Sequence, residues 1–252
     1  MAMVSAEAAA SEEESMRVSM VRSYGNSDGG VERRYGLFMH IAVLMLGLMT
    51  IATTPSLQAQ QAAKPIKLVV LGDSLSAGLG LPAQDSFPAK LKKSLQDKGI
   101  AVDMTNAGVS GDTSSGGRDR LDWSVPEGTD GVIVELGAND ALRGVDPDLT
   151  RAALTDIVQR LKARKIAVML CGMLAPPNYG ADYAARFNSI YPDLAKKFDV
   201  LLYPFFLEGV AADAKLNQAD GIHPTAAGVD IIVGNIMPTA EAFLGTITEQ
   251  RR

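Results

Sequence analysis

Cysteine and histidine are scarce in this 252-residue sequence, which contains one cysteine, Cys171, and two histidines, His40 and His223. One cysteine cannot form a disulfide within the chain, and it cannot supply the several thiolates of a metal cluster. The fold must therefore be held together by packing, and no metal site is indicated.

Basic residues are also few relative to acidic ones. The chain has 24 Lys and Arg against 29 Asp and Glu, and its formal net charge is −5 at pH 7. Phosphate backbones are bound by clustered Lys and Arg, so nucleic acid is excluded as a partner. The same shortage argues against binding to a membrane surface through a basic patch.

The N-terminal quarter of the chain does not have the composition of a packed domain. Residues 1–32 hold few large apolar side chains, so we expect them to be disordered or to be an extension from a misplaced start codon. Residues 33–59 pair two arginines with the apolar run 36–51 and small residues up to Ala59, which is the pattern of a signal peptide. The run is short for a membrane span, which needs about 20 apolar residues.

These features predict export to the periplasm or the medium, with cleavage near Ala59 and no stable membrane span in the mature protein. An uncleaved N-terminal anchor facing the periplasm is the alternative. Residues 60–252 are then predicted to form one domain, with no indication of an oligomeric state. Because His40 lies in the signal segment, His223 is the only imidazole expected in the mature protein.

Short apolar runs alternate with longer amphipathic stretches through residues 60–252. This alternation predicts an α/β fold with a five-stranded parallel sheet between two layers of helices, a flavodoxin-like three-layer sandwich. In the predicted helix 147–164, Leu149 and Leu154 are expected on one side. The other expected helices cover residues 87–98, 183–198 and 225–244, and the strands cover residues 66–71, 101–107, 131–136, 166–173 and 200–203.

Four candidate site residues follow predicted strands or precede the last helix. Ser74, Gly111 and Asn139 come just after the first, second and third strands, and His223 lies in the loop before the last helix. Sites in doubly wound sheets form beyond the carboxyl ends of the strands, so these four residues should converge on one edge.

Serine, aspartate and histidine occur in an order that suits nucleophilic acyl transfer. Ser74 stands at a strand-to-helix turn, and Asp220 precedes His223 by three residues, close enough to orient its ring. The plainer interpretation is that Asp73 and Ser74 cap a helix and that Asp220 with Gly221 forms a turn.

An acyl-transfer site also needs donors for the oxyanion. The Gly111 amide and the side-chain amide of Asn139 are candidates, although glycine and asparagine are also common in turns.

Taken together, four ordered blocks resemble the SGNH or GDSL hydrolase superfamily. Further runs such as Val134-Glu135-Leu136-Gly137 are similar to its periplasmic thioesterase I, arylesterase and lysophospholipase branch. The four blocks are Gly72-Asp73-Ser74-Leu75, Gly108 to Gly111, Gly137-Ala138-Asn139-Asp140 and Asp220-Gly221-Ile222-His223-Pro224.

The resemblance implies that Ser74 is the nucleophile, His223 the general base and Asp220 its orienting acid. It implies an oxyanion hole of the Ser74 amide, the Gly111 amide and the Asn139 side chain. It also implies a small-molecule ester or thioester substrate and no cofactor. The alternatives are a deacetylase of sugars or envelope glycans with the same residues, and a non-catalytic ligand-binding domain.

Other polar residues are interpreted as structural. Asp73 is expected to bond free amides of the turn, Asp140 and Arg143 to form a local ion pair or cap, and Cys171 to fill the core. Glu135 lies inside a predicted strand without an evident reason.

One loop, Met173-Leu174-Ala175, departs from the family pattern. If it shapes the acyl pocket, as in similar enzymes, chain-length preference cannot be carried over.

Overall fold

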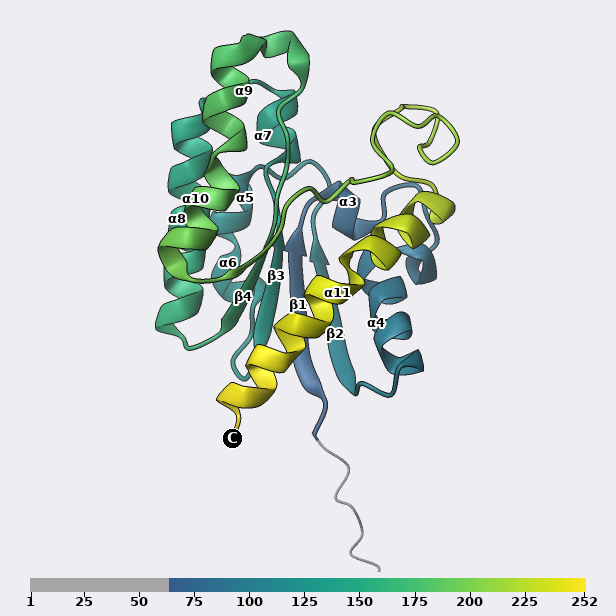
Figure 1. Cartoon of the computed structure of the whole chain (residues 1–252), viewed down its shortest axis with the longest axis vertical. Coiled ribbons are helices and arrows are strands. Elements are labelled where there is room, and N and C mark those ends of the chain that lie inside the picture. The colour runs from purple at the N-terminus through teal and green to yellow at the C-terminus, as the bar shows by residue number, and fades with distance from the viewer. Residues whose placement is uncertain (1–63) are drawn as a thin grey trace, which may run out of the picture. The chain divides into compact units, whose positions relative to one another are not determined.

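The computed structural model describes residues 64–252 of the chain (Figure 1). The extension predicted at residues 1–32 and the signal peptide predicted at 33–59 lie outside the described residues. The strands are β1 (Ile66–Gly72), β2 (Val102–Gly108), β3 (Gly131–Glu135), β4 (Ala167–Cys171) and β5 (Leu201–Tyr203). The helices are α3 (Ser74–Ala77), α4 (Phe87–Asp97), α5 (Ser114–Asp119), α6 (Leu121–Ser124), α7 (Ala138–Leu142), α8 (Pro147–Ala163), α9 (Gly180–Asn188), α10 (Ile190–Phe198) and α11 (Ala226–Gln250).

The five strands form one parallel sheet in the order β2-β1-β3-β4-β5. This order is the flavodoxin-like one, which confirms the predicted fold class. In the sheet, Gly72 is in register with Gly108 of β2 and with Glu135 of β3. The carboxyl ends of the three strands therefore lie at one level, where the loops that follow them can meet.

Helices cover both faces of the sheet. Helices α4 and α11 lie together on one face, and α5, α8 and α10 lie on the other (Figure 1). By length and composition α11 could cross a membrane, but core helices pass the same test, and 44% of its most apolar stretch is buried.

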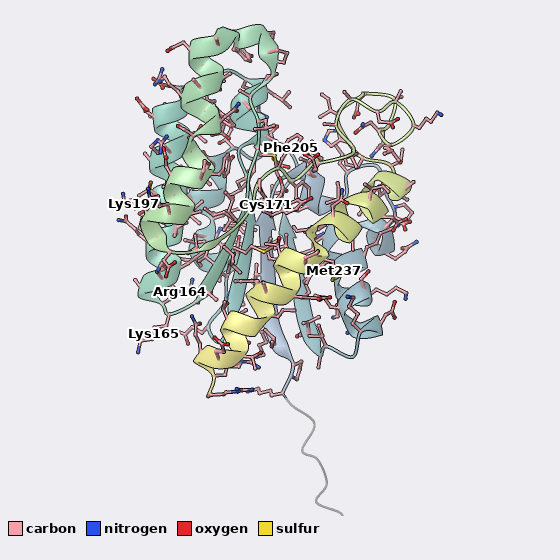
Figure 2. The ribbon with its side chains drawn as sticks, in the orientation of Figure 1. Arg164, Lys165, Cys171, Lys197, Phe205 and Met237 are labelled. Atoms are coloured by element: carbon pink, nitrogen blue, oxygen red, sulfur yellow. The ribbon has the colours of Figure 1, made fainter. Side chains whose placement is uncertain are left out.

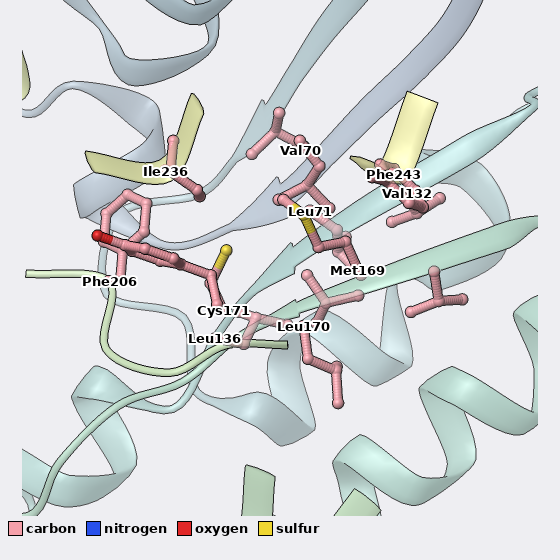
Figure 3. Close-up of a cluster of buried hydrophobic side chains, with 14 of the residues drawn as sticks. Val70, Leu71, Val132, Leu136, Met169, Leu170, Cys171, Phe206, Ile236 and Phe243 are labelled. Carbon is pink, nitrogen blue, oxygen red and sulfur yellow. The ribbon is translucent and has the colours of Figure 1, made fainter. Parts of the chain in front are cut away.

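The strands supply the centre of the core. Figure 3 shows Val70, Leu71 and Met169 packed among side chains from α11 and from the loop after β5. Cys171 is fully buried in this cluster, as predicted, and burial raises the pKa of its thiol well above the usual range. A neutral buried thiol is a poor nucleophile.

The predicted helix 183–198 is wrong in its continuity, because the structure has two helices there, α9 and α10. Pro192 has no N–H with which to bond the carbonyl of Asn188, four residues earlier, so the first helix ends at Asn188.

The prediction that Leu149 shares a side of α8 with Leu154 is also wrong, since 62% of the Leu149 surface is exposed. It lies five residues before Leu154, which is about 140° away around a helix. The last helix extends to Gln250, beyond its predicted end at residue 244.

Candidate active site

Ser74 begins α3, directly after the carboxyl end of β1. Asp73 is the N-cap of this helix, and its Oδ1 accepts a hydrogen bond from the Leu75 amide at 2.9 Å. Gly72 leaves no room for a side chain, because an added Cβ would lie 2.4 Å from Ser76 Oγ and 2.6 Å from Glu135 Oε2. The turn that presents Ser74 therefore depends on a small residue before it and a capping carboxylate beside it.

Ser74, His223 and Asp220 form one chain of hydrogen bonds. Ser74 Oγ lies 2.8 Å from His223 Nε2, and His223 Nδ1 lies 2.7 Å from Asp220 Oδ2. This is the arrangement in which an imidazole can take a proton from a serine while a carboxylate fixes its tautomer.

The loop before α11 holds the acid and the imidazole in place. Asp220 Oδ1 accepts the amides of His223 at 3.0 Å and Ile222 at 2.9 Å. These two backbone bonds, with the bond to the imidazole, hold the pKa of Asp220 below its usual range. The Gln218 amide in turn donates to the His223 carbonyl at 2.7 Å.

The proposed oxyanion donors meet at the same place. Ser74, Gly111, Asn139 and His223 all line one pocket. Gly111 has a φ of +84°, a left-handed conformation that favours glycine. Asn139 Nδ2 donates to Asp73 Oδ2 at 3.1 Å and to the Asp112 carbonyl at 2.9 Å, so an incoming oxyanion would have to share or replace one of these bonds.

The pocket has a volume of about 610 Å³ and its wall is largely apolar. The loop Met173-Leu174-Ala175 contributes to it, and Leu79, Leu142, Leu174 and Ile222 are each more than 40% exposed at its border. Its apolar lining comprises Leu75, Leu79, Ala138, Ala141, Leu142, Met173, Leu174, Ala175, Pro176, Pro177, Phe205, Leu207, Ala211, Ala212 and Ile222.

Few aromatic rings reach this pocket. Phe205 lines it, but Phe206 is buried against Phe87 in the core. The hydroxyl groups of Tyr179 and Tyr191 donate instead to the carbonyls of α7 and of the residue after β3. Among the residues that line the pocket, Phe205 is therefore the single phenyl ring on which a sugar could stack.

Glu135, unexplained from the sequence, lies under the turn that carries Ser74. It is fully buried, and its Oε2 accepts hydrogen bonds from Ser76 Oγ at 2.6 Å and from the Asp73 amide at 3.3 Å. Burial, with the nearby Asp73 carboxylate, raises the pKa of Glu135 well above its ordinary value. Burial also raises the pKa of Asp73, from 3.8 to about 6.

Asp140 and Arg143 do not form the predicted ion pair. Asp140 accepts hydrogen bonds from the Ser114 amide at 2.8 Å and from Thr150 Oγ1 at 2.9 Å. Arg143 Nη2 donates to the Gly111 carbonyl at 3.0 Å. Asp140 therefore binds the first amide of α5, a helix whose N-cap is Thr113, and does not form a cap near Asn139.

Arg120 is a residue near the site that the sequence did not single out. Arg120 is buried and bonds the Gly72 carbonyl, immediately before the Ser74 turn. Within residues 64–252, no group of three or more His, Cys, Asp or Glu side chains is arranged to hold a metal ion.

Comparison with known proteins places the chain in a family of hydrolases. The sequence profile of the GDSL-like lipase/acylhydrolase family matches residues 70–231. The chain is 40% identical over 204 residues to esterase TesA of Pseudomonas aeruginosa, covering 81% of this chain and 99% of that protein. It is 41% identical over 186 residues to thioesterase 1/protease 1/lysophospholipase L1 of Escherichia coli, covering 73% of this chain and 84% of the relative.

Comparison with solved structures indicates the same family. The crystal structure of AlinE4, an SGNH-hydrolase family esterase, has a TM-score of 0.61 and 44% identity, covering 71% of this chain and 96% of that one. The chain belongs to the GDSL-like lipase/acylhydrolase family, the SGNH hydrolases, as its four blocks predicted. It is an ester-hydrolysing enzyme rather than a non-catalytic ligand-binding domain.

Proposed function

We propose that this enzyme hydrolyses carboxylic esters and thioesters of acyl chains through a covalent acyl-enzyme on Ser74. The observation that carries the proposal is the hydrogen-bonded chain from Ser74 through His223 to Asp220, whose first two residues line a largely apolar pocket. The names of the relatives, esterase and thioesterase/lysophospholipase, support the substrate class.

The first half of the reaction forms the acyl-enzyme. Ser74 Oγ attacks the carbonyl carbon of the substrate while His223 Nε2 takes its proton. The tetrahedral intermediate collapses as the bond to the alcohol or thiol breaks, and His223 gives its proton to that leaving group. Asp220 keeps the Nδ1 proton in place and stabilises the imidazolium between the two steps.

The second half returns the enzyme to its starting state. A water molecule replaces the leaving group. His223 takes a proton from this water, and the water oxygen attacks the acyl carbon. Collapse of the second intermediate breaks the bond to Ser74 Oγ, which recovers its proton from His223. The product is the carboxylic acid.

Both intermediates carry a negative oxygen that needs donors. The Ser74 amide, the Gly111 amide and Asn139 Nδ2 are the proposed donors, and each removal of such a donor costs about 3 to 4 kcal/mol in the transition state. The existing Asn139 bonds to Asp73 and to the Asp112 carbonyl hold its side chain at the pocket wall before substrate arrives.

The pocket favours acyl chains over acetylated sugars. Its volume of about 610 Å³ is typical of small-molecule sites, and its apolar lining would bury methylene groups at a gain of about 0.8 kcal/mol each. Recognition of a sugar needs stacking rings and several polar groups, and among the lining residues only Phe205 is aromatic. The glycan deacetylase therefore remains the second candidate.

We also propose that residues 60–252 act as one exported domain, released by cleavage near Ala59. Determination of the N-terminal residue of the protein recovered outside the cytoplasm tests this directly. Recovery of a membrane-bound protein that still contains residues 33–59 would support the anchored alternative.

The function is tested by turnover across p-nitrophenyl esters, acyl-CoA thioesters, lysophospholipids and acetylated sugars. Ser74→Ala and His223→Ala should each lower kcat by about 10³-fold or more, because both residues act in the transition state. Ser189→Ala is the matched control, since its hydroxyl bonds Arg186 and Arg151 away from the pocket. Undiminished ester turnover by Ser74→Ala would refute the assignment.

A further inference from the structure

Arg120 is a buried arginine that the reaction just described does not use. Only 6% of its surface is exposed, and it does not line the pocket. A buried charge is costly unless it is paired and its hydrogen-bonding groups are satisfied. Arg120 pairs with Asp112, whose Oδ2 accepts from Arg120 Nε at 2.5 Å.

The remaining donors of Arg120 reach three other groups. Nη1 donates to the Ala107 carbonyl at 2.8 Å and to Ser124 Oγ at 3.0 Å, and Nη2 donates to the Gly72 carbonyl at 2.7 Å. One guanidinium thus joins the ends of β1 and β2 to α6 and to the loop after β2.

The partners of Arg120 lie next to the proposed oxyanion donors in the chain or bind one of them. Gly72 is two residues before Ser74, whose amide is one donor. Asp112 follows Gly111, whose amide is the second. The carbonyl of Asp112 accepts from Asn139, the third donor, at 2.9 Å. Arg120 therefore binds Gly72 and Asp112 directly, and these two residues are close in the chain to Ser74 and Gly111. It is linked to Asn139 through Asp112.

We propose that Arg120 is a positioning residue that sets the Ser74 turn and the Gly111 loop at the spacing the oxyanion requires. This inference rests on the proposed function, because it assumes that the Ser74 and Gly111 amides bind the oxyanion. The planar guanidinium presents donors in fixed directions, which a lysine ammonium cannot reproduce at several acceptors at once.

The expected defect is catalytic rather than one of substrate binding. Displacement of reacting groups by about 1 Å can lower a rate by about 10²-fold. The acyl pocket is lined by other residues, so loss of Arg120 should lower kcat about ten- to a hundredfold and leave KM within about twofold of wild type.

The variants are Arg120→Met, Arg120→Lys and Asp112→Asn in the full chain. Arg120→Lys keeps the charge but loses the fork, so it should lose nearly as much kcat as Arg120→Met. Asp112→Asn still presents an oxygen acceptor to Arg120 and should lose less. Arg164→Met is the matched control, because its Nη2 donates to the Val125 carbonyl at 2.6 Å.

The control lies at the opposite end of the sheet from the pocket. Figure 2 shows Arg164 far from Phe205, which lines the pocket. Its loss should lower the melting temperature without lowering kcat per active site. Active sites are counted by the end-point of labelling with an organophosphonate serine probe, and folding is checked by near-UV circular dichroism at the assay temperature.

The rate of phosphonate labelling gives a second readout, because the phosphonyl oxygen needs the same donors. It should fall in parallel with kcat in the Arg120 variants and stay unchanged in Arg164→Met. Wild-type kcat per active site in a folded Arg120→Lys or Arg120→Met would overturn the proposal, as would an equal loss in Arg164→Met. If Arg120→Met does not fold, Arg120→Lys and Asp112→Asn decide. Failure of the proposed function would appear separately, as full activity in Ser74→Ala.

Discussion

Replacement of Asp73 by asparagine is expected to change how the stability of the enzyme depends on pH. Burial raises the pKa of Asp73 from 3.8 to about 6, against the opposing effect of hydrogen bonds from the Leu75 amide and Asn139. The folded state therefore binds this proton more tightly than the unfolded state does. Its stabilising contribution is complete only well below pH 3.8, the ordinary pKa, and is lost as the pH rises through about 6.

The size of the effect follows from the two pKa values. At about 1.4 kcal/mol for each pKa unit, the difference between 3.8 and about 6 corresponds to about 3 kcal/mol of unfolding free energy. Part of the titration lies below pH 4, so about 2 kcal/mol should be lost between pH 4 and pH 7. Solvent screening does not reduce this figure, because the Asp73 side chain is fully buried.

The assay is urea denaturation of wild type and Asp73→Asn at pH 4, 5, 6, 7 and 8. Far-UV circular dichroism is the better signal, since the single tryptophan, Trp123, is 73% exposed and changes its surroundings little on unfolding. The unfolding free energy of wild type minus that of Asp73→Asn should fall by about 2 kcal/mol from pH 4 to pH 7.

Glu135 provides an internal check, because the Asp73 charge contributes to its raised pKa. The double variant Asp73→Asn/Glu135→Gln has neither ionisable group and should show less pH dependence over this range than either single variant. A free-energy difference between wild type and Asp73→Asn that is equal at pH 4 and pH 7 would refute the reasoning.

Three other changes have expected outcomes. Asp220→Asn should lower kcat about 10³- to 10⁴-fold in a p-nitrophenyl ester assay, because an amide favours the wrong tautomer of the imidazole. Gly137→Ala should lower the unfolding free energy by about 2 kcal/mol or more in denaturant titrations, because φ is +114° and the added Cβ would lie 2.1 Å from Tyr191 Oη. Leu174→Asp should lower kcat/KM for decanoyl esters about tenfold more than for acetyl esters, because the carboxylate weakens burial of the longer chain.

Each of these has a result that would contradict it. A kcat for Asp220→Asn within tenfold of wild type would show that the carboxylate does not orient the imidazole. An unchanged unfolding free energy in Gly137→Ala would show that the backbone at this φ tolerates a side chain and that the Tyr191 hydroxyl can move aside. Leu149→Asp is the control for Leu174→Asp, since Leu149 is exposed and outside the pocket. An equal effect in the two would exclude a role for Leu174 in chain-length preference.

The fold could be predicted because its parallel strands are continuous apolar runs separated by helices. The predicted strand ends agree with the structure to within two residues. The break between α9 and α10 was missed because both halves keep an apolar face, and only the missing N–H of Pro192 separates them. Leu149 was misplaced because an apolar residue in the first turn of a helix need not share its buried face.

The residues brought together at Ser74 were all predicted, because each lies in a short local motif at the end of an element. No role could be assigned to Glu135 or Arg120 from the sequence. Their hydrogen bonds join residues 59 and 48 positions apart, between Glu135 and Ser76 and between Arg120 and Gly72. A buried ionisable residue of this kind is explained only when its distant partners are known.

The hydrogen bond between Ser74 and His223 joins residues 149 positions apart. The proposed nucleophile and oxyanion donors follow the first three strands, whereas the proposed acid and base lie in the loop before α11. Contacts at such separation form late, since a long stretch of chain must be ordered before they close. Enzyme activity is therefore expected to report completion of folding: a nascent chain that has not yet extended past residue 223 has the proposed nucleophile but not the proposed base, and should not hydrolyse an ester.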